Sequence, residues 1–176
     1  GCGGWHVQRA PWPGEPAPAA SRRYYQREMA GQPMSATFIA NGREVQVLGF
    51  NAQNVRGIGT RPFVFCGVIG PVTVPPALAR QVTAIARAVT VHFGLRGVCS
   101  LDFMRDGDAI GVLEVNPRPP ASMGLYHGAA GVPDLMRAHV QACLYGALPP
   151  VPAPAAQVAG FETVYARRPL ALDAAT

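Results

Sequence analysis

The chain has 176 residues, which suits one domain of ordinary size or two small lobes, and 49% of them are apolar. No apolar run reaches the roughly 18 residues of a membrane-spanning helix, which argues against a membrane protein. Fifteen basic residues, all of them arginine, stand against ten acidic ones and give a formal net charge of +5. The arginines are scattered along the chain, so the charge does not indicate nucleic-acid binding.

The cysteines and the start of the chain bear on the compartment. Cys2, Cys66, Cys99 and Cys143 lie far apart and form no Cys-x-x-Cys pair, so neither a zinc site nor a disulfide framework is predicted. No signal-peptide pattern is present, and we expect a cytoplasmic protein. The chain opens in a glycine-rich turn with no strand before it, and we expect that its first part is missing.

The N-terminal 70 residues predict mostly strands. A short strand over 5–8 is expected first, and residues 10–21, rich in proline and alanine, predict an exposed loop. Asn41-Gly42 between two apolar runs is a strong hairpin signal. The polar, glycine-bearing residues 51–62 predict a loop. The remaining strands are predicted over 24–29, 34–40, 44–50 and 63–69.

A helix is predicted over 76–93, because Leu78, Val82, Ile85 and Val89 recur at helical spacing and Gly94 follows as a stop. Two apolar strands are predicted over 97–105 and 109–115, joined at an Asp-Gly turn.

A second helix is predicted over 132–145, with Leu135, Leu144 and either His139 or Val140 facing inward. A proline- and alanine-rich linker and a strand over 160–166 follow. Antiparallel hairpins with two helices predict an α+β fold.

The two strands that meet at the Asp-Gly turn carry four polar side chains. Asp102 lies in the middle of the first strand, and Glu114 and Asn116 are two residues apart on the second, so both point to one face. Arg118 follows a proline that stiffens the end of the strand. Two carboxylates on one sheet face repel each other unless a cation lies between them, and Mg²⁺ prefers oxygen ligands. The alternative is a solvated face on which these side chains meet only water.

This pattern resembles the metal-binding signature of ATP-grasp enzymes, an Asp on one strand and Glu-x-Asn-Pro-Arg on the next. Gly1-Cys2-Gly3-Gly4-Trp5-His6 resembles the mobile glycine-rich loop of that family, and residues 25–35 resemble the strand–turn–strand that joins its two lobes. Residues 119–124 resemble the carboxylate–amine ligase subset. The resemblance covers about residues 1–146 and implies an α+β ATP-grasp fold, with two lobes around a nucleotide cleft, incomplete at the N-terminus.

The resemblance also implies site residues. The ligands of Mg²⁺, with Mn²⁺ as an alternative, would be Asp102, Glu114 and Asn116, and the catalytic cation that neutralises the transferring phosphoryl group would be Arg118. The residues that contact ATP would be Gly3 and Gly4 at the phosphates and Gln26, Glu28 and Met29 at the adenine.

The implied reaction is ATP-dependent ligation of a small-molecule carboxylate to an amine through an acyl phosphate, with a role in cofactor biosynthesis as a narrower expectation. No nucleic acid or membrane is expected as a partner, and a homodimer is left open.

The resemblance also implies three parts of the chain. Residues 1–50 would be the remainder of the first lobe, with its glycine-rich loop and hinge. Residues 51–146 would be the metal- and phosphate-binding lobe, and residues 147–176 a linker and C-terminal strand.

The chain departs from the family pattern in two ways. It has no lysine, although the family usually places lysines at the phosphates, and it offers Gln32-Pro33-Met34 where an acidic residue often binds the ribose. A degenerate nucleotide-binding module that catalyses nothing is therefore the second hypothesis, and a carboxylate-paired hydrolase is a third. His6, Arg61, Ser122 and His127 each stay open between a ligand contact and a structural role, whereas His92 and His139 are expected to be structural.

Overall fold

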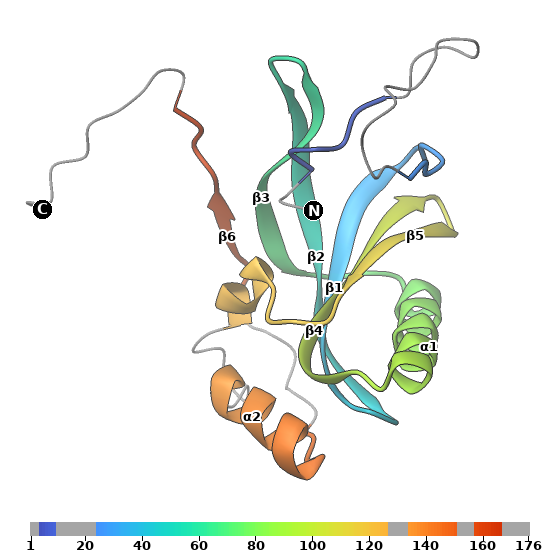
Figure 1. Cartoon of the computed structure of the whole chain (residues 1–176), viewed down its shortest axis with the longest axis vertical. Helices are drawn as coiled ribbons and strands as arrows, with labels where there is room; N and C mark the ends of the chain where they lie inside the picture. The colour runs from blue at the N-terminus through green and yellow to red at the C-terminus, as the bar shows by residue number, and fades with distance from the viewer. Residues whose placement is uncertain (1–3, 10–23, 127–133, 151–156, 167–176) are drawn as a thin grey trace, which may run out of the picture.

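The computed structural model describes residues 4–9, 24–126, 134–150 and 157–166 (Figure 1). Its strands form one antiparallel sheet in the order β5-β4-β1-β2-β3-β6. They are β1 (Gln32–Asn41), β2 (Val45–Ile58), β3 (Arg61–Val72), β4 (Arg96–Asp106), β5 (Ala109–Asn116) and β6 (Ala159–Glu162). The helices are α1 (Pro76–Phe93), the 3-10 helix η1 (Ala121–Tyr126) and α2 (Leu135–Tyr145). The α+β class predicted from the sequence is confirmed.

The hairpin between β1 and β2 turns at Asn41-Gly42, as predicted. Asn41 Oδ1 accepts hydrogen bonds from the backbone N–H groups of Arg43 at 3.0 Å and Glu44 at 2.8 Å. Gly42 adopts φ +92°, a region that favours glycine. This local chemistry sets the register in which β1, in the middle of the sheet, pairs with β2.

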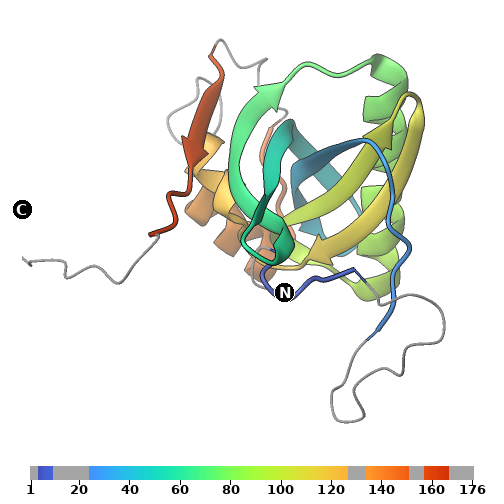
Figure 2. The same ribbon diagram turned by 90° about the horizontal axis from the view of Figure 1, so that it is seen from above.

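One face of the sheet packs against α1. Met34 and Phe38 of β1 point to the same face, because they are an even number of positions apart, and they lie in one apolar cluster with Leu78 and Val82 of α1. The helix has the predicted bounds, and Gly94 ends it in the left-handed conformation with φ 64°. Figure 2 shows α1 on one side of the sheet, and η1 and α2 on the other.

The opposite face is apolar at one end and polar at the other. Ile39 and Val98 are fully buried in a second cluster with Leu125 of η1 and Leu135 of α2. Because side chains alternate along a strand, Asp102 lies on the same face of β4 as Val98, beyond the part that these two helices contact. The fold therefore leaves the carboxylate end of this face uncovered by α1 or the second apolar cluster.

The prediction of a loop over residues 51–62 is wrong. β2 continues to Ile58 and β3 begins at Arg61, with Gly59 and Thr60 forming the turn. The pairing of Val55 with Phe65 shows why, since backbone hydrogen bonds to β3 outweigh the weak strand propensity of this polar stretch.

The strands predicted over 5–8 and 24–29 are also wrong. Residues 4–6 form a turn, and 24–30 run without regular structure next to the edge strand β5. Side chains hold the two segments in place, including an ion pair between Arg9 and Glu28 with a 2.8 Å N–O distance. Neither segment pairs its backbone with a strand of the sheet.

The inward face of α2 differs from the prediction. Its buried residues are Leu135, Ala138 and Ala142, whereas Leu144 is 66% exposed. The helix packs close to β4, where a Cβ on Gly97 would overlap His139, so small side chains face the sheet. The expectation that His139 is structural agrees with its contact, because Nδ1 accepts a hydrogen bond from the backbone N–H of Val98 at 2.9 Å.

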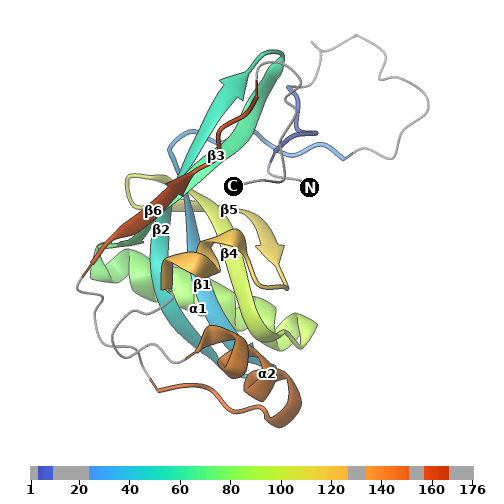
Figure 3. The same cartoon turned by 90° about the vertical axis from the view of Figure 1, so that its left-hand side faces the viewer.

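β6 closes the far edge of the sheet beside β3, as Figure 3 shows. It is shorter than the predicted 160–166, because only residues 159–162 pair with β3. No helix of the described residues is long and apolar enough to cross a membrane. The proposed division of the chain into 1–50, 51–146 and 147–176 stays a prediction, and its first boundary falls inside β2.

Candidate functional site

The two predicted carboxylates lie opposite each other in the sheet. Asp102 of β4 pairs with Glu114 of β5, just before a β-bulge that follows Asp102. Directly opposed residues of antiparallel strands project their side chains to the same face, about 5 Å apart at Cβ. Asp102 is partly buried and Glu114 is exposed, so the pair lies at the border between the sheet interior and solvent.

The Asn116 side chain joins the two carboxylates. Its Nδ2 donates to Asp102 Oδ2 at 3.3 Å and to Glu114 Oε1 at 3.5 Å. Arg118 lies beyond it, with Nη2 donating to Asn116 Oδ1 at 3.5 Å and Nη1 to the carbonyl of Pro119 at 3.4 Å. The structure thus brings together the four residues that the sequence pattern selected for metal binding and phosphoryl transfer.

The environment of Asp102 disfavours its charged form. Burial, followed by the charge of Glu114, raises the pKa of Asp102 from 3.8 to about 7, although hydrogen bonds from Asn116 and Gln53 partly oppose this. The raised pKa of Asp102 therefore reflects its burial first and its closeness to the Glu114 carboxylate second. A bound cation would lower the pKa of Asp102, because its positive charge favours the ionised carboxylate.

Gln53 is a neighbour of this site that the sequence analysis missed. It lies on β2, in the stretch predicted to be a loop, and its side chain acts to lower the pKa of Asp102. The spacing of Asn51 and Gln53, two polar residues two positions apart, is the signal that a strand prediction would have used to place both on this face.

The oxygen atoms at the site fit a small, hard divalent cation. Within the described ranges, no three His, Cys, Asp or Glu side chains are grouped so that they could hold a metal ion. The third protein ligand at this site would therefore be an amide. Two carboxylates and an amide oxygen suit Mg²⁺ or Mn²⁺, which take further ligands from phosphates and water. Asn116 presents its NH₂ group to the carboxylates, so it would have to turn its amide over to offer Oδ1 to a cation.

The predicted adenine contacts lie along the outer edge of β5. Gln26 Nε2 donates to the carbonyl of Leu113, next to Glu114, at 3.1 Å. The side chain of Met29 covers Gly111, because a Cβ at this glycine would overlap it. Glu28 is held by Arg9, whose guanidinium lowers the pKa of the Glu28 carboxyl. Gln26 and Met29 therefore lie along β5, the strand that carries Glu114, and the role of Gln26, Glu28 and Met29 in nucleotide binding remains a prediction.

The glycine-rich segment packs against the β2–β3 hairpin. Gly3 lies outside the described residues, and Gly4 adopts φ +75° with its Cα facing the carbonyl of Phe63. Trp5 stacks on Tyr165, with ring centroids 5.5 Å apart, and the guanidinium of Arg61 lies 3.6 Å from the Trp5 ring centroid. The phosphate contacts predicted for Gly3 and Gly4 are untested.

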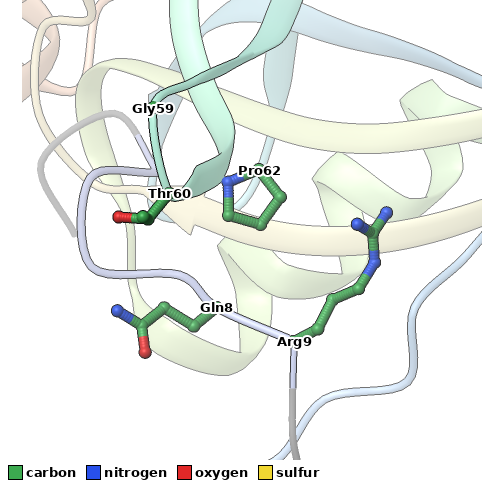
Figure 4. Close-up of a pocket in the computed structure, with 5 residues that line it drawn as sticks. All are labelled: Gln8, Arg9, Gly59, Thr60 and Pro62. Atoms are coloured by element: carbon green, nitrogen blue, oxygen red, sulfur yellow. The ribbon is translucent and has the colours of Figure 1, made fainter.

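A surface pocket of about 520 Å³ lies at the tip of this hairpin (Figure 4). It is lined by Gln8, Arg9, Gly59, Thr60 and Pro62. Neither carboxylate lines it. The arginine in the pocket is already paired with Glu28, so the pocket offers no uncompensated charge.

The open residues have varied surroundings. His6 is exposed, Arg61 stacks on Trp5, and Ser122 is buried with Oγ 2.9 Å from Thr37 Oγ1. His127 lies outside the described residues. His92 is exposed and packs edge-on against its neighbouring phenylalanine, and its structural role stays a prediction.

A family model of the ATP-grasp domain matches residues 1–122, and the chain belongs to the ATP-grasp family. Two relatives, the carbamoyl phosphate synthase large chains of two strains of Thermus thermophilus, are each 28% identical over 95 residues, which is 54% of this chain and 9% of theirs. The family assignment made from the Glu-x-Asn-Pro-Arg pattern is thereby confirmed.

Solved structures share the fold. N5-carboxyaminoimidazole ribonucleotide synthetase from Thermus thermophilus superposes with a TM-score of 0.58 and 21% identity, over 70% of this chain and 33% of its own. Biotin carboxylase from Campylobacter jejuni gives 0.55 and 14%, over 67% of this chain and 26% of its own. The chain therefore spans about a third or less of these relatives.

Proposed function

We propose that the protein is an ATP-dependent carboxylate–amine ligase that works with Mg²⁺, or Mn²⁺ in its place. The observation that supports this most directly is the arrangement of Asp102, Glu114 and Asn116 beside Arg118, in a chain of the ATP-grasp family. The relatives named above include a synthase and a synthetase, which agrees with ligation chemistry.

The proposed residue roles follow from charge. Asp102 and Glu114 would hold the metal ion, which when bound supplies positive charge that stabilises the phosphates. Arg118, exposed at the end of β5, would place its guanidinium against the transferring phosphoryl group. Gly3 and Gly4 would cover the phosphates with backbone N–H groups, and residues 26–29 would bind the adenine.

The reaction that we propose has two steps. A carboxylate oxygen of the substrate attacks the γ-phosphorus of ATP, the bond to the β,γ-bridging oxygen breaks, and ADP leaves with its electron pair. The amine nitrogen of the second substrate then attacks the acyl carbon, inorganic phosphate leaves, and the nitrogen loses a proton to give the amide. Positioning and charge neutralisation carry most of the catalysis in phosphoryl transfer, which suits a site built from fixed polar side chains.

Other parts of the proposal extend beyond the site. We propose small-molecule carboxylate and amine substrates, a place in cofactor biosynthesis, action in the cytoplasm, and a homodimer as the assembly to test. Cys66, Cys99 and Cys143 are free thiols, which agrees with a reducing compartment.

The test uses ATP turnover by the full-length protein. Glu114→Ala and Asn116→Ala should each abolish Mg-ATP turnover, whereas Glu44→Gln, an exposed residue in the β1–β2 turn, should retain it. Undiminished turnover in both site variants would refute the assignment.

The absence of lysine from the sequence favours a second candidate, a nucleotide-binding module without catalysis. A thermal-shift assay separates the two when it is combined with turnover. Stabilisation by Mg-ATP without ADP production would support the module, and ADP production that depends on Glu114 would support the ligase.

A further inference from the structure

A buried hydrogen-bond network links η1 to the middle of the sheet. Tyr126 of η1 donates its hydroxyl to Asn51 Oδ1 at 2.7 Å. Asn51 Nδ2 donates in turn to Ser35 Oγ at 3.2 Å and Thr37 Oγ1 at 3.1 Å. A second link joins Ser122, also in η1, to the Thr37 hydroxyl at 2.9 Å. The side chain of Asn51 therefore has both its donors and its acceptor engaged.

Every side chain of this network is buried. Asn51 and Thr37 have no exposed surface, and Tyr126 is 2% exposed. A buried polar network that satisfies all its members fixes geometry strongly, because any alternative arrangement leaves a polar atom without a partner. Burial raises the pKa of Tyr126 to about 12, so its hydroxyl remains a donor at neutral pH.

Two strand glycines make room for the Tyr126–Asn51 pair. A Cβ on Gly49 would lie 2.7 Å from the Tyr126 hydroxyl. A Cβ on Gly70 would overlap Asn51 Oδ1. Neither glycine has a positive φ, so neighbouring side chains exclude a Cβ at both positions: Tyr126 and Pro71 at Gly49, and Asn51 at Gly70.

The network lies beside Asp102 in the sheet, and its two η1 residues follow β5 closely in the sequence. Ser35 is the register partner of both Asn51 and Asp102, so the three side chains form a row across β2, β1 and β4. Only residues 117–120 separate the end of β5 from η1. The segment that carries Arg118 is therefore anchored at one end by β5 and at the other by the bonds from Ser122 and Tyr126.

We infer that Tyr126 and Asn51 are positioning residues, whose hydrogen bond holds η1 against the sheet and so keeps Arg118 in place beside Asp102 and Asn116. This inference rests on the proposed function, in which Arg118 contacts the terminal phosphate of ATP. Tyr126 acts only through Arg118 and touches no reacting group.

The first test compares nucleotide affinities by calorimetry in the full-length protein. Arg118→Ala should raise the Kd of Mg-ATP about 10-fold, while the Kd of Mg-ADP, which lacks the terminal phosphate, stays within about 2-fold. Tyr126→Phe should raise the Kd of Mg-ATP about 3- to 10-fold with the same selectivity. The double variant should bind Mg-ATP no more weakly than Arg118→Ala alone, because Tyr126 has nothing left to position.

The matched control is Thr83→Val, which removes a hydroxyl that hydrogen-bonds at 2.7 Å to the Ala79 carbonyl within α1, on the other face of the sheet. It should leave both affinities unchanged. Equal weakening of Mg-ATP and Mg-ADP by Tyr126→Phe, or additive loss in the double variant, would overturn the inference and leave the proposed function intact. A wild-type protein that binds neither nucleotide would overturn the proposed function and this inference with it.

The second test needs no nucleotide. Backbone hydrogen exchange in the peptide spanning residues 117–126 should be faster in Tyr126→Phe than in the wild type and unchanged in Thr83→Val. Unchanged exchange in Tyr126→Phe would contradict the anchoring role. If Tyr126→Phe fails to fold, Ser122→Ala removes the other link and should give the same two results, and their absence would count against the inference in the same way.

Discussion

Asp102 and Glu114 occupy directly opposed positions on β4 and β5, and the NH₂ group of Asn116 donates to both. Two carboxylates at this separation repel each other, and the neutral amide between them offsets only part of that repulsion. The stability of the protein should therefore respond both to divalent metal and to pH.

Replacing Asp102 should stabilise the protein when no divalent metal is present. Asp102→Asn keeps the shape of the side chain and removes a partly buried charge that faces Glu114, so we expect a gain on the order of 1 kcal/mol in the free energy of unfolding at pH 8. The same variant should lose the stabilisation that Mg²⁺ gives to the wild type. Thermal unfolding with EDTA and with Mg²⁺ measures both effects, and a variant that Mg²⁺ still stabilises as strongly as the wild type would exclude Asp102 as a ligand.

The stability of the metal-free protein should depend on pH through the same carboxyl group. The pKa of Asp102 is about 7 in the folded state and 3.8 ordinarily, so between these values the folded state binds a proton that the unfolded state has released. The contribution of Asp102 is therefore most favourable below about pH 4, declines as the pH rises to about 7, and is constant above that. Denaturant titrations across pH 4–8 should show that the wild type loses stability relative to Asp102→Asn over this range. A parallel pH dependence of the two proteins would contradict the raised pKa.

A methyl group on Gly111 should test the role of residues 26–29. Gly111→Ala places a Cβ against the flexible end of the Met29 side chain, which can move at small cost, so we expect a loss in unfolding free energy of less than about 1.5 kcal/mol. If the segment around Met29 binds adenine, the affinity for Mg-ATP and Mg-ADP should fall together, by roughly 3- to 10-fold. Calorimetry with both nucleotides measures this effect. If Gly111→Ala leaves both affinities unchanged, the segment around Met29 is not part of the nucleotide site.

Gly97 should tolerate no side chain. It adopts φ +81°, and an added Cβ would overlap His139 Nδ1 and lie 2.8 Å from Cys143 Sγ. Gly97→Ala should therefore destabilise the protein by about 2–4 kcal/mol, through backbone strain and displacement of α2. Gly107→Ala is the matched control, because Gly107 also has a positive φ, of 58°, but has open space around it, so only the backbone strain of about 1 kcal/mol is expected there. Denaturant unfolding measures both variants. Equal losses of unfolding free energy in Gly97→Ala and Gly107→Ala would show that α2 can move away from Gly97 at little cost.

The sequence alone determined the features that arise within short stretches of chain. The helical spacing of apolar residues and a terminal Gly94 define α1, and Asn41-Gly42 defines the β1–β2 hairpin. Asp102, Glu114 and Asn116 could be placed together because a single Asp-Gly turn joins their strands, so the hairpin register brings them to one face. In each case the interacting groups are close in sequence, and local geometry is sufficient.

Only the tertiary structure decided the features that depend on partners far away in the chain. The polar stretch around Asn51 and Gln53 becomes part of β2 because it pairs with β1 up to Ala52 and with β3 beyond it, although its polar composition predicted a loop. Residues 24–30 have the composition of a strand but remain irregular beside β5. The same long-range pairing carries Asn51 under Tyr126 and Gln53 towards Asp102, because hydrogen bonds between distant segments, and the burial that accompanies them, are decided only when the sheet assembles.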